Sequence, residues 1–223
     1  MTKKLFLQAI VKFISGLFLF GLLLFVPAGT VKYPNGWLLI AVLFVPMFAA
    51  GIIMTFKNPD LLKKRLNAKE EEKEQKAVVA FSGMMFLAAF VTAGLNFRFQ
   101  WFLLPRWAVI IGTAVFLLAY AMYAEVLREN AYLSRTVEIQ ENQKVIDTGL
   151  YGVVRHPMYS ATLFLFLSMG IILGSPISFA VLFLYIPIIA KRMKNEEKVL
   201  EEGLDGYREY KKKVKYKVIP FVW

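Results

Sequence analysis

The sequence contains no cysteine and only one histidine among its 223 residues. Without cysteine there is no disulfide framework and no thiolate site for zinc or an iron–sulfur cluster. Cysteine usage therefore does not indicate whether the protein works in an oxidising or a reducing compartment. We predict no metal site.

Long apolar runs dominate the chain, in which 58% of residues are hydrophobic. Four runs, at 8–28, 37–56, 78–97 and 107–126, each have close to the ~20 residues that a helix needs to cross a hydrocarbon core. The run 159–190 is longer and contains Gly174-Ser175-Pro176, which predicts a helical hairpin. The prediction is an all-α integral membrane bundle of five to six helices, the last two forming the hairpin 158–190. Gly83, Gly94 and Gly112 are expected at close helix contacts.

Positive charge is distributed unevenly between the two ends of these spans. Of the basic residues, 23 fall on one side, whereas Lys32, Arg98 and Arg106 fall on the other and Lys12 lies inside the first span. Loops that face the cytoplasm carry the excess of lysine and arginine. Both termini of this multi-pass protein are therefore expected to be cytoplasmic, in a bacterial or archaeal cell membrane or its equivalent.

The net charge of +11 follows the same pattern. Positive-inside topology and attraction to anionic lipid headgroups explain this net charge more simply than nucleic-acid binding does. We therefore set nucleic-acid binding aside. The charged connector 57–77 is interpreted as a solvated helix, and the alternative is a lid or a headgroup-binding element.

A polar stretch at 148–159 contains the only histidine and ends where the last apolar run begins. In it Arg155 and His156 directly precede Pro157. Proline at the first helical position places the preceding side chains, and the free amides of the next turn, at the mouth of a membrane helix. An anionic ligand would find hydrogen-bond donors there.

Other polar segments are expected on the same side of the membrane. Asn130 follows the fourth span, and Glu125 before it belongs either to a surface ion-pair cluster or to a polar wall of the site. Arg192 and Glu196 are four residues apart and can pair along the last helix. The segment 136–146 resembles a short hairpin or an extended loop. The aromatic and basic tail 205–223 is expected to lie on the membrane surface.

The order and spacing of these motifs resemble the isoprenylcysteine carboxyl methyltransferase and phospholipid methyltransferase superfamily. The resemblance covers roughly the last 75 to 95 residues and departs from the family at Leu150, where proline is common, and at Ala161, where glycine is frequent. It rests on the stretch 149–159, the hydrophobic hairpin, Arg192 with Glu196-Glu197, Gly206-Tyr207-Arg208-Glu209-Tyr210 and the closing Ile219-Pro220.

The resemblance implies an integral-membrane methyltransferase that uses S-adenosylmethionine, bound near the cytoplasmic face between the Arg-His-Pro loop and the helix of the double glutamate. On this basis 1–130 would be the N-terminal spans and 131–223 the catalytic region. The residues expected to bind the cofactor are Tyr151, Gly152, Val153, Arg155, His156, Pro157, Tyr159, Glu196 and Glu197. The residues expected to be catalytic are Arg192, Glu196 and Asn130.

The chemistry of the cofactor agrees with this set of residues. Its carboxylate or its adenine edge would meet Arg155, His156 and the amides of Gly152 and Val153, while Glu196 or Glu197 would accept from the ribose hydroxyls or the ammonium. Which group meets which part of the cofactor is left open. Methyl transfer depends mostly on orientation and on exclusion of water. A carboxylate acceptor would need no base, whereas a primary amine would need one.

The acceptor is expected to be lipophilic: a prenylated carboxylate, a lipid amine or another hydrophobic small molecule that enters from the bilayer. A first alternative is an NADPH-dependent membrane reductase of sterol or isoprenoid type, which would need a further arginine cluster beside Arg155 and Arg192. A second alternative is a small transporter, which would place ionisable residues in mid-membrane. The oligomeric state is left open.

Overall fold

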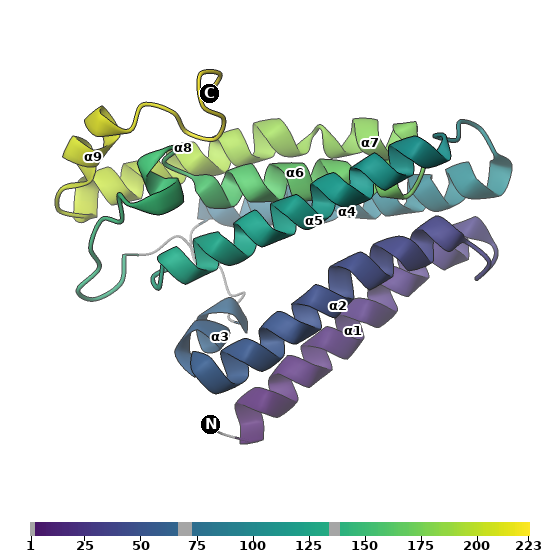
Figure 1. Ribbon diagram of the computed structural model, residues 1–223, viewed down its shortest axis with the longest axis horizontal. Coiled ribbons are helices and arrows are strands. Elements are labelled where there is room, and N and C mark those ends of the chain that lie inside the picture. The colour runs from purple at the N-terminus through teal and green to yellow at the C-terminus, as the bar shows by residue number, and fades with distance from the viewer. Residues whose placement is uncertain (1–2, 67–72, 134–138) are drawn as a thin grey trace.

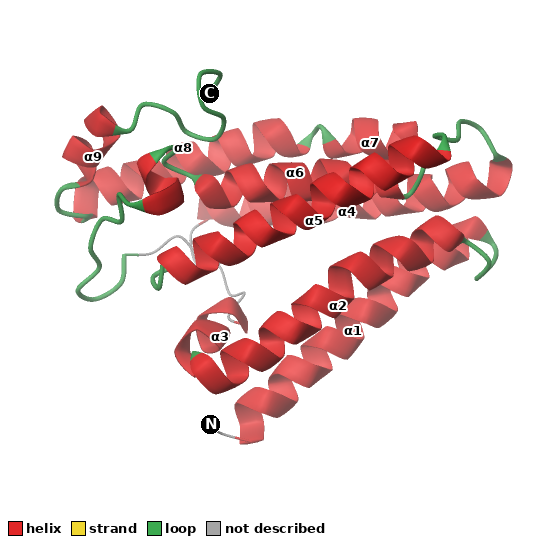
Figure 2. Cartoon of the chain, in the orientation of Figure 1, coloured by secondary structure: helices red, strands yellow, loops and turns green. Residues whose placement is uncertain are grey.

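The computed structural model describes residues 3–66, 73–133 and 139–223, which are mostly helical (Figure 1). No strand occurs in these ranges (Figure 2). The elements are α1 (Lys3–Ala28), α2 (Pro34–Lys57), α3 (Pro59–Leu66), α4 (Lys73–Phe99), α5 (Arg106–Glu129), the 3₁₀ turn η1 (Gly149–Gly152), α6 (Pro157–Ile172), α7 (Pro176–Leu182), α8 (Tyr185–Gly203) and α9 (Tyr207–Lys213).

The all-α integral membrane bundle predicted from the sequence is confirmed. Five helical segments of the described chain are long and apolar enough to cross a membrane, namely Phe6–Ala28, Pro34–Lys57, Gln75–Phe99, Arg106–Glu129 and Pro176–Gly203. Most extend beyond the predicted spans because helical backbone continues past the apolar stretch into polar flanks. The remaining apolar helix, α6, has only 16 residues, which is fewer than the ~20 that a full span requires.

The predicted hairpin is present, with α6 as one arm and α7 and α8 as the other. Its turn has Gly174 at φ +71, a backbone conformation that glycine adopts without steric cost, and the side chain of Ser175 caps α7 by accepting from the amide of Ser178. The second arm is interrupted between α7 and α8, which we did not predict. Pro187 explains the interruption, because its ring would clash with the carbonyl of Phe183, four residues earlier.

Two of the three glycines expected at helix contacts are packed tightly. A Cβ on Gly94 would lie 2.7 Å from the carbonyl oxygen of Leu24 in α1, and one on Gly112 would lie 2.6 Å from a methyl of Ile171 in α6. A Cβ on Gly83, in contrast, would have no atom within 4 Å. The expectation is therefore wrong for Gly83, because this residue lies on an exposed face of α4.

The connecting elements divide the bundle into two ends. Figure 1 shows α3, η1 and α9 at one end, which we call the motif end, and the tight turns before α2, α5 and α7 at the other. The described part of the expected hairpin or loop, 139–146, contains no strand, and 136–138 lie outside the described residues.

The tail does not lie as we expected. Tyr207 and Tyr210 are buried against the protein rather than exposed to a membrane surface. The hydroxyl of Tyr210 donates to the backbone carbonyl of Tyr151 at 2.8 Å. The expectation is therefore wrong for these two tyrosines, because η1 and α8 offer them a packed environment that includes a hydrogen-bond acceptor.

The hairpin generates a test of helix packing. A Cβ on Gly170 would lie 2.5 Å from the backbone nitrogen of Phe179, so the two arms would have to separate. We expect Gly170→Ala to cost about 1–3 kcal/mol through overpacking, measured as a lower melting temperature in detergent. Gly83→Ala, in open space, is the matched control and should not lower it. Equal melting temperatures for the two variants would contradict this account of the hairpin.

Candidate functional site

A cavity of about 520 Å³ opens at the motif end, between elements that are far apart in sequence. Its polar side chains come mainly from α3, α5, the loop and motif between Gln143 and Tyr159, α8 and α9. Its apolar side chains come mainly from α4, α6 and α8, and they include Val78, Val79, Phe86, Phe166, Ile188 and Ile189. One part of the cavity wall is therefore charged, and another part is apolar.

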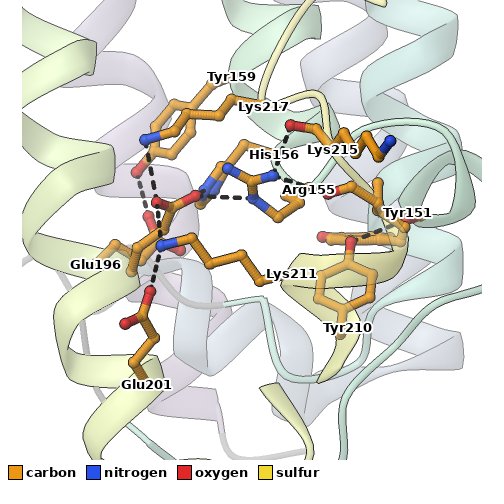
Figure 3. A network of polar contacts seen from close by, with 12 residues as sticks. Tyr151, Arg155, His156, Tyr159, Glu196, Glu201, Tyr210, Lys211, Lys215 and Lys217 are labelled. Carbon is orange, nitrogen blue, oxygen red and sulfur yellow. Dashed lines mark hydrogen bonds and ion pairs between the residues drawn. The ribbon is translucent and has the colours of Figure 1, made fainter. Parts of the chain in front are cut away.

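The carboxylate of Glu197 lies beside the motif, on α8. Its Oε1 accepts from Arg155 Nε at 2.9 Å and lies 3.1 Å from His156 Nε2, while its Oε2 lies 3.0 Å from Lys217 Nζ (Figure 3). An ionised carboxylate only accepts hydrogen bonds, so His156 must carry its hydrogen on Nε2. Glu197 is only 4% exposed. Its charge is thus compensated by cations from the motif and from the tail.

The tail also holds the motif through its backbone. The amides of Arg155 and His156 donate to the carbonyls of Tyr216 and Lys217 at 2.9 and 2.8 Å. The guanidinium of Arg155 donates further to the carbonyl of Val214, at 2.7 Å. The motif is therefore bonded to the tail through both backbone and side chain and cannot turn independently of it.

The amides in which we expected an anion-binding site are already used within the chain. Gly152 N donates to Thr148 O at 3.2 Å, and Val153 N donates to Leu150 O at 3.1 Å. Pro157 occupies the first turn of α6, as its position before the apolar run predicted. The backbone of this loop thus supports the wall of the cavity, to which the loop contributes the side chains of Tyr151, Arg155 and His156.

Three side chains from the two arms of the hairpin meet on the cavity wall. Arg192 Nε on α8 donates to the hydroxyl of Tyr159 on α6 at 2.9 Å, and that hydroxyl donates to Glu196 Oε2 at 2.8 Å. Arg192 and Glu196, which the sequence placed four apart on one helix, are thus bridged by a tyrosine one turn into α6. The group presents a cation, a hydroxyl and a carboxylate to the same space.

The end of α5 makes hydrogen bonds to η1, apart from the Tyr159, Arg192 and Glu196 group. Asn130 Nδ2 donates to the hydroxyl of Tyr151 at 2.9 Å, which joins α5 to η1. The neighbouring Glu129 accepts from the amide of Leu150 at 3.0 Å. Glu125 does not line the cavity and pairs with Arg128, which agrees with the surface ion-pair interpretation.

Tyr207 contributes a polar atom that has no partner. Its side chain lines the cavity and is 4% exposed, yet its hydroxyl makes no hydrogen bond to the described residues. Burial raises the pKa of Tyr207 well above the ordinary value of a phenol, so the hydroxyl stays protonated. Buried polar groups are usually bonded. The hydroxyl of Tyr207 is therefore a buried donor beside the cavity that the described residues leave unsatisfied.

The predicted site residues separate into two groups. Those that line the cavity are Asn130, Tyr151, Arg155, His156, Tyr159, Arg192 and Glu196. Gly152, Val153, Pro157 and Glu197 do not line it and instead support those that do. The cavity is also lined by residues that were not predicted as site residues, namely Arg65, Tyr123, Tyr185, Tyr207 and Tyr210. For Tyr207 and Tyr210 the signal was available in the element Gly206-Tyr207-Arg208-Glu209-Tyr210, on which the resemblance rests.

Comparison with known proteins bears on the same region. Residues 107–205 match the family model of phospholipid methyltransferases. A solved structure of the eukaryotic intramembrane Ras methyltransferase, an isoprenylcysteine carboxyl methyltransferase, shares the fold with a TM-score of 0.54 and 19% sequence identity, over 92% of this chain and 74% of that one. No curated protein sequence is significantly similar. The superfamily resemblance predicted from the motifs is confirmed by the family match over residues 107–205, and the solved structure shares the fold.

The Glu197 contacts lead to a prediction about stability. Replacing one partner of a buried ion pair leaves the other charge unpaired, at a cost of about 3–5 kcal/mol. We therefore expect Glu197→Gln to lower the melting temperature in detergent clearly, because Arg155 loses its carboxylate. Glu201→Gln, on the same helix but partly exposed, should change it little. A Glu197→Gln variant as stable as the wild type would show that this carboxylate does not hold the motif.

Proposed function

We propose that this membrane protein, whose residues 107–205 match the family model of phospholipid methyltransferases, transfers a methyl group from S-adenosylmethionine to a lipophilic acceptor. The observation that carries the proposal is the shared cavity. One space is lined both by the Tyr159, Arg192 and Glu196 group and by apolar side chains of membrane helices. A polar cofactor and a lipophilic acceptor can therefore bind in the same cavity. The excess of basic residues at the motif end supports the cytoplasmic face as the side of the reaction.

The apolar part of the cavity reaches the outer surface of the bundle. Val79 of α4 lines the cavity and is also 49% exposed. Side chains on this face of a membrane helix contact lipid. A lipophilic acceptor would thus enter sideways from the bilayer along α4 and would not have to cross water.

The side chains present fit S-adenosylmethionine. Glu196 would accept hydrogen bonds from the ribose hydroxyls or from the ammonium, and the orphaned hydroxyl of Tyr207 would donate to an oxygen of the cofactor. The guanidinium of Arg155 and the imidazole ring of His156 line the same cavity. When bound, the cofactor would supply a methyl group whose leaving group is activated by its own positive charge. Tyr151 and Tyr159 would complete the cofactor site from η1 and α6.

The chain's own contribution is orientation and exclusion of water. Arg192 is held by Tyr159 and would fix the reacting group of the acceptor, while Asn130 holds Tyr151 against the end of α5. Gly152, Val153, Pro157 and Glu197 act behind these side chains as positioning residues.

Charge in the cavity favours an anionic acceptor over an amine. The described lining includes four cations, Arg65, Lys144, Arg155 and Arg192, but Glu196 is its only carboxylate. An ammonium acceptor would be repelled by these cations and would need a base, whereas Glu196 already accepts from Tyr159. A carboxylate acceptor needs no base and would be attracted. We therefore propose O-methylation of a lipophilic carboxylate.

Cofactor identity can be tested by thermal shift on detergent-solubilised protein. We expect S-adenosylmethionine and S-adenosylhomocysteine each to raise the melting temperature, because a ligand that binds the folded state at 100 times its Kd adds about 2.7 kcal/mol. NADPH, measured in parallel, should have no effect. Stabilisation by NADPH alone would refute the methyltransferase proposal and favour the reductase.

The role of Glu196 can be tested by binding of S-adenosylhomocysteine in isothermal titration calorimetry. We expect Glu196→Gln to weaken binding by roughly tenfold or more, because a hydrogen bond to a charged acceptor contributes about 1.5–3 kcal/mol. Glu125→Gln, which alters a carboxylate outside the cavity, is the control and should bind as the wild type does. An unchanged Kd for Glu196→Gln would place the cofactor elsewhere.

A further inference from the structure

The short helix α3 brings an arginine into the cavity from outside the family-matched region. Arg65 lines the cavity, and its Nη2 donates to the hydroxyl of Tyr123 on α5. Its guanidinium carbon also lies 5.5 Å from the centroid of the Tyr123 ring. Arg65 thus enters beside α5, whereas Arg192 enters from α8.

α3 is docked in a way that holds this arginine in place. Leu61 and Leu62 are buried, and the side chain of Asn58 caps the helix by accepting from the amide of Leu61 at 3.1 Å. At the other end, Lys12 Nζ on α1 donates to the carbonyl of Leu66. A cation at a helix C-terminus satisfies a carbonyl that has no helical partner and complements the helix dipole. The position of Arg65 is therefore set by both ends of α3.

The chemistry of this pair suits an anion. A guanidinium has five N–H donors in a planar fork that matches carboxylate and phosphate oxygens. A tyrosine hydroxyl that accepts from Arg65 still has its own hydrogen to donate. Together Arg65 and Tyr123 offer two kinds of donor to one oxyanion at the cavity wall.

The site also lies where an amphiphile would place its polar group. Val78 and Val79 of α4 line the apolar part of the same cavity, as does Phe86, about two turns further along. A hydrocarbon chain lying along α4 would have its polar end among the cations of the motif end. Arg65 and Tyr123 supply such a contact without using the Tyr159, Arg192 and Glu196 group.

We propose that Arg65 and Tyr123 determine acceptor specificity by binding the anionic group of an amphiphilic acceptor, a carboxylate or a phosphate on a long hydrocarbon chain. This inference rests on the proposed function, since the bound anion is that of the methyl acceptor. It assigns a binding role to the 57–77 connector, beyond the region matched by the family model. Lys12 acts as a positioning residue for this contact.

The test is equilibrium binding of single-chain probes to the full-length protein in a non-ionic detergent. The probes are hexadecanoate, hexadecyl phosphate and hexadecan-1-ol, which share one chain length and differ in head group. We expect both anions to bind the wild type more tightly than the alcohol, and the tighter of the two identifies the head group. Arg65→Gln should weaken anion binding by roughly tenfold or more, and Tyr123→Phe, which keeps the ring, should weaken it to a smaller extent.

Two controls separate this inference from the proposed function. Lys63→Gln changes an exposed lysine on α3 that does not line the cavity and should bind the anions normally. S-adenosylhomocysteine should bind Arg65→Gln and the wild type equally. Equal anion binding by the wild type, Arg65→Gln and Tyr123→Phe would overturn the specificity role, as would anions that bind no better than the alcohol. Failure of the wild type to bind S-adenosylhomocysteine, with anion binding still dependent on Arg65, would refute the methyltransferase proposal alone. If Arg65→Gln does not fold, Tyr123→Phe decides the question.

Discussion

The buried carboxylate of Glu197 connects three segments on which the site depends. It accepts from Arg155 and His156 of the motif and pairs with Lys217 of the tail, while being carried by the last membrane helix. Burying a charge is costly unless it is paired and hydrogen-bonded. The motif, α8 and the tail therefore have to come together for any of these charges to be accommodated, and the cavity forms between them.

The cavity divides its tasks between the two halves of the chain. The hairpin and the motif supply Tyr159, Arg192 and Glu196, which are suited to a polar cofactor and to the reacting group. The earlier helices α3 and α4 supply Arg65 and an apolar wall, which are suited to an amphiphile. Such a division would let one reaction centre serve different acceptors, because Arg65 and the α4 side chains proposed to contact the acceptor lie outside residues 107–205.

Much of the fold was predictable because its causes are local. A run of about twenty apolar residues must form a helix in lipid, since no water is present to satisfy its backbone groups. Gly174 and Ser175 marked the hairpin turn, and Pro157 marked the start of α6, through backbone preferences that require no distant partner. Pro187 had a local effect of the same kind, on the carbonyl of Phe183, and the break it causes was missed because apolar composition masked it.

By itself the sequence determined the membrane bundle, the hairpin and the segments from which the site is built. Tertiary structure alone decided which side chains face the cavity. Glu196 and Glu197 are adjacent, but successive helical residues point ~100° apart, so one lines the cavity and the other is buried behind it against Arg155. Tyr207 and Arg65 reach the same space from the tail and from α3. No local pattern encodes that meeting, because it depends on how helices distant in sequence pack together.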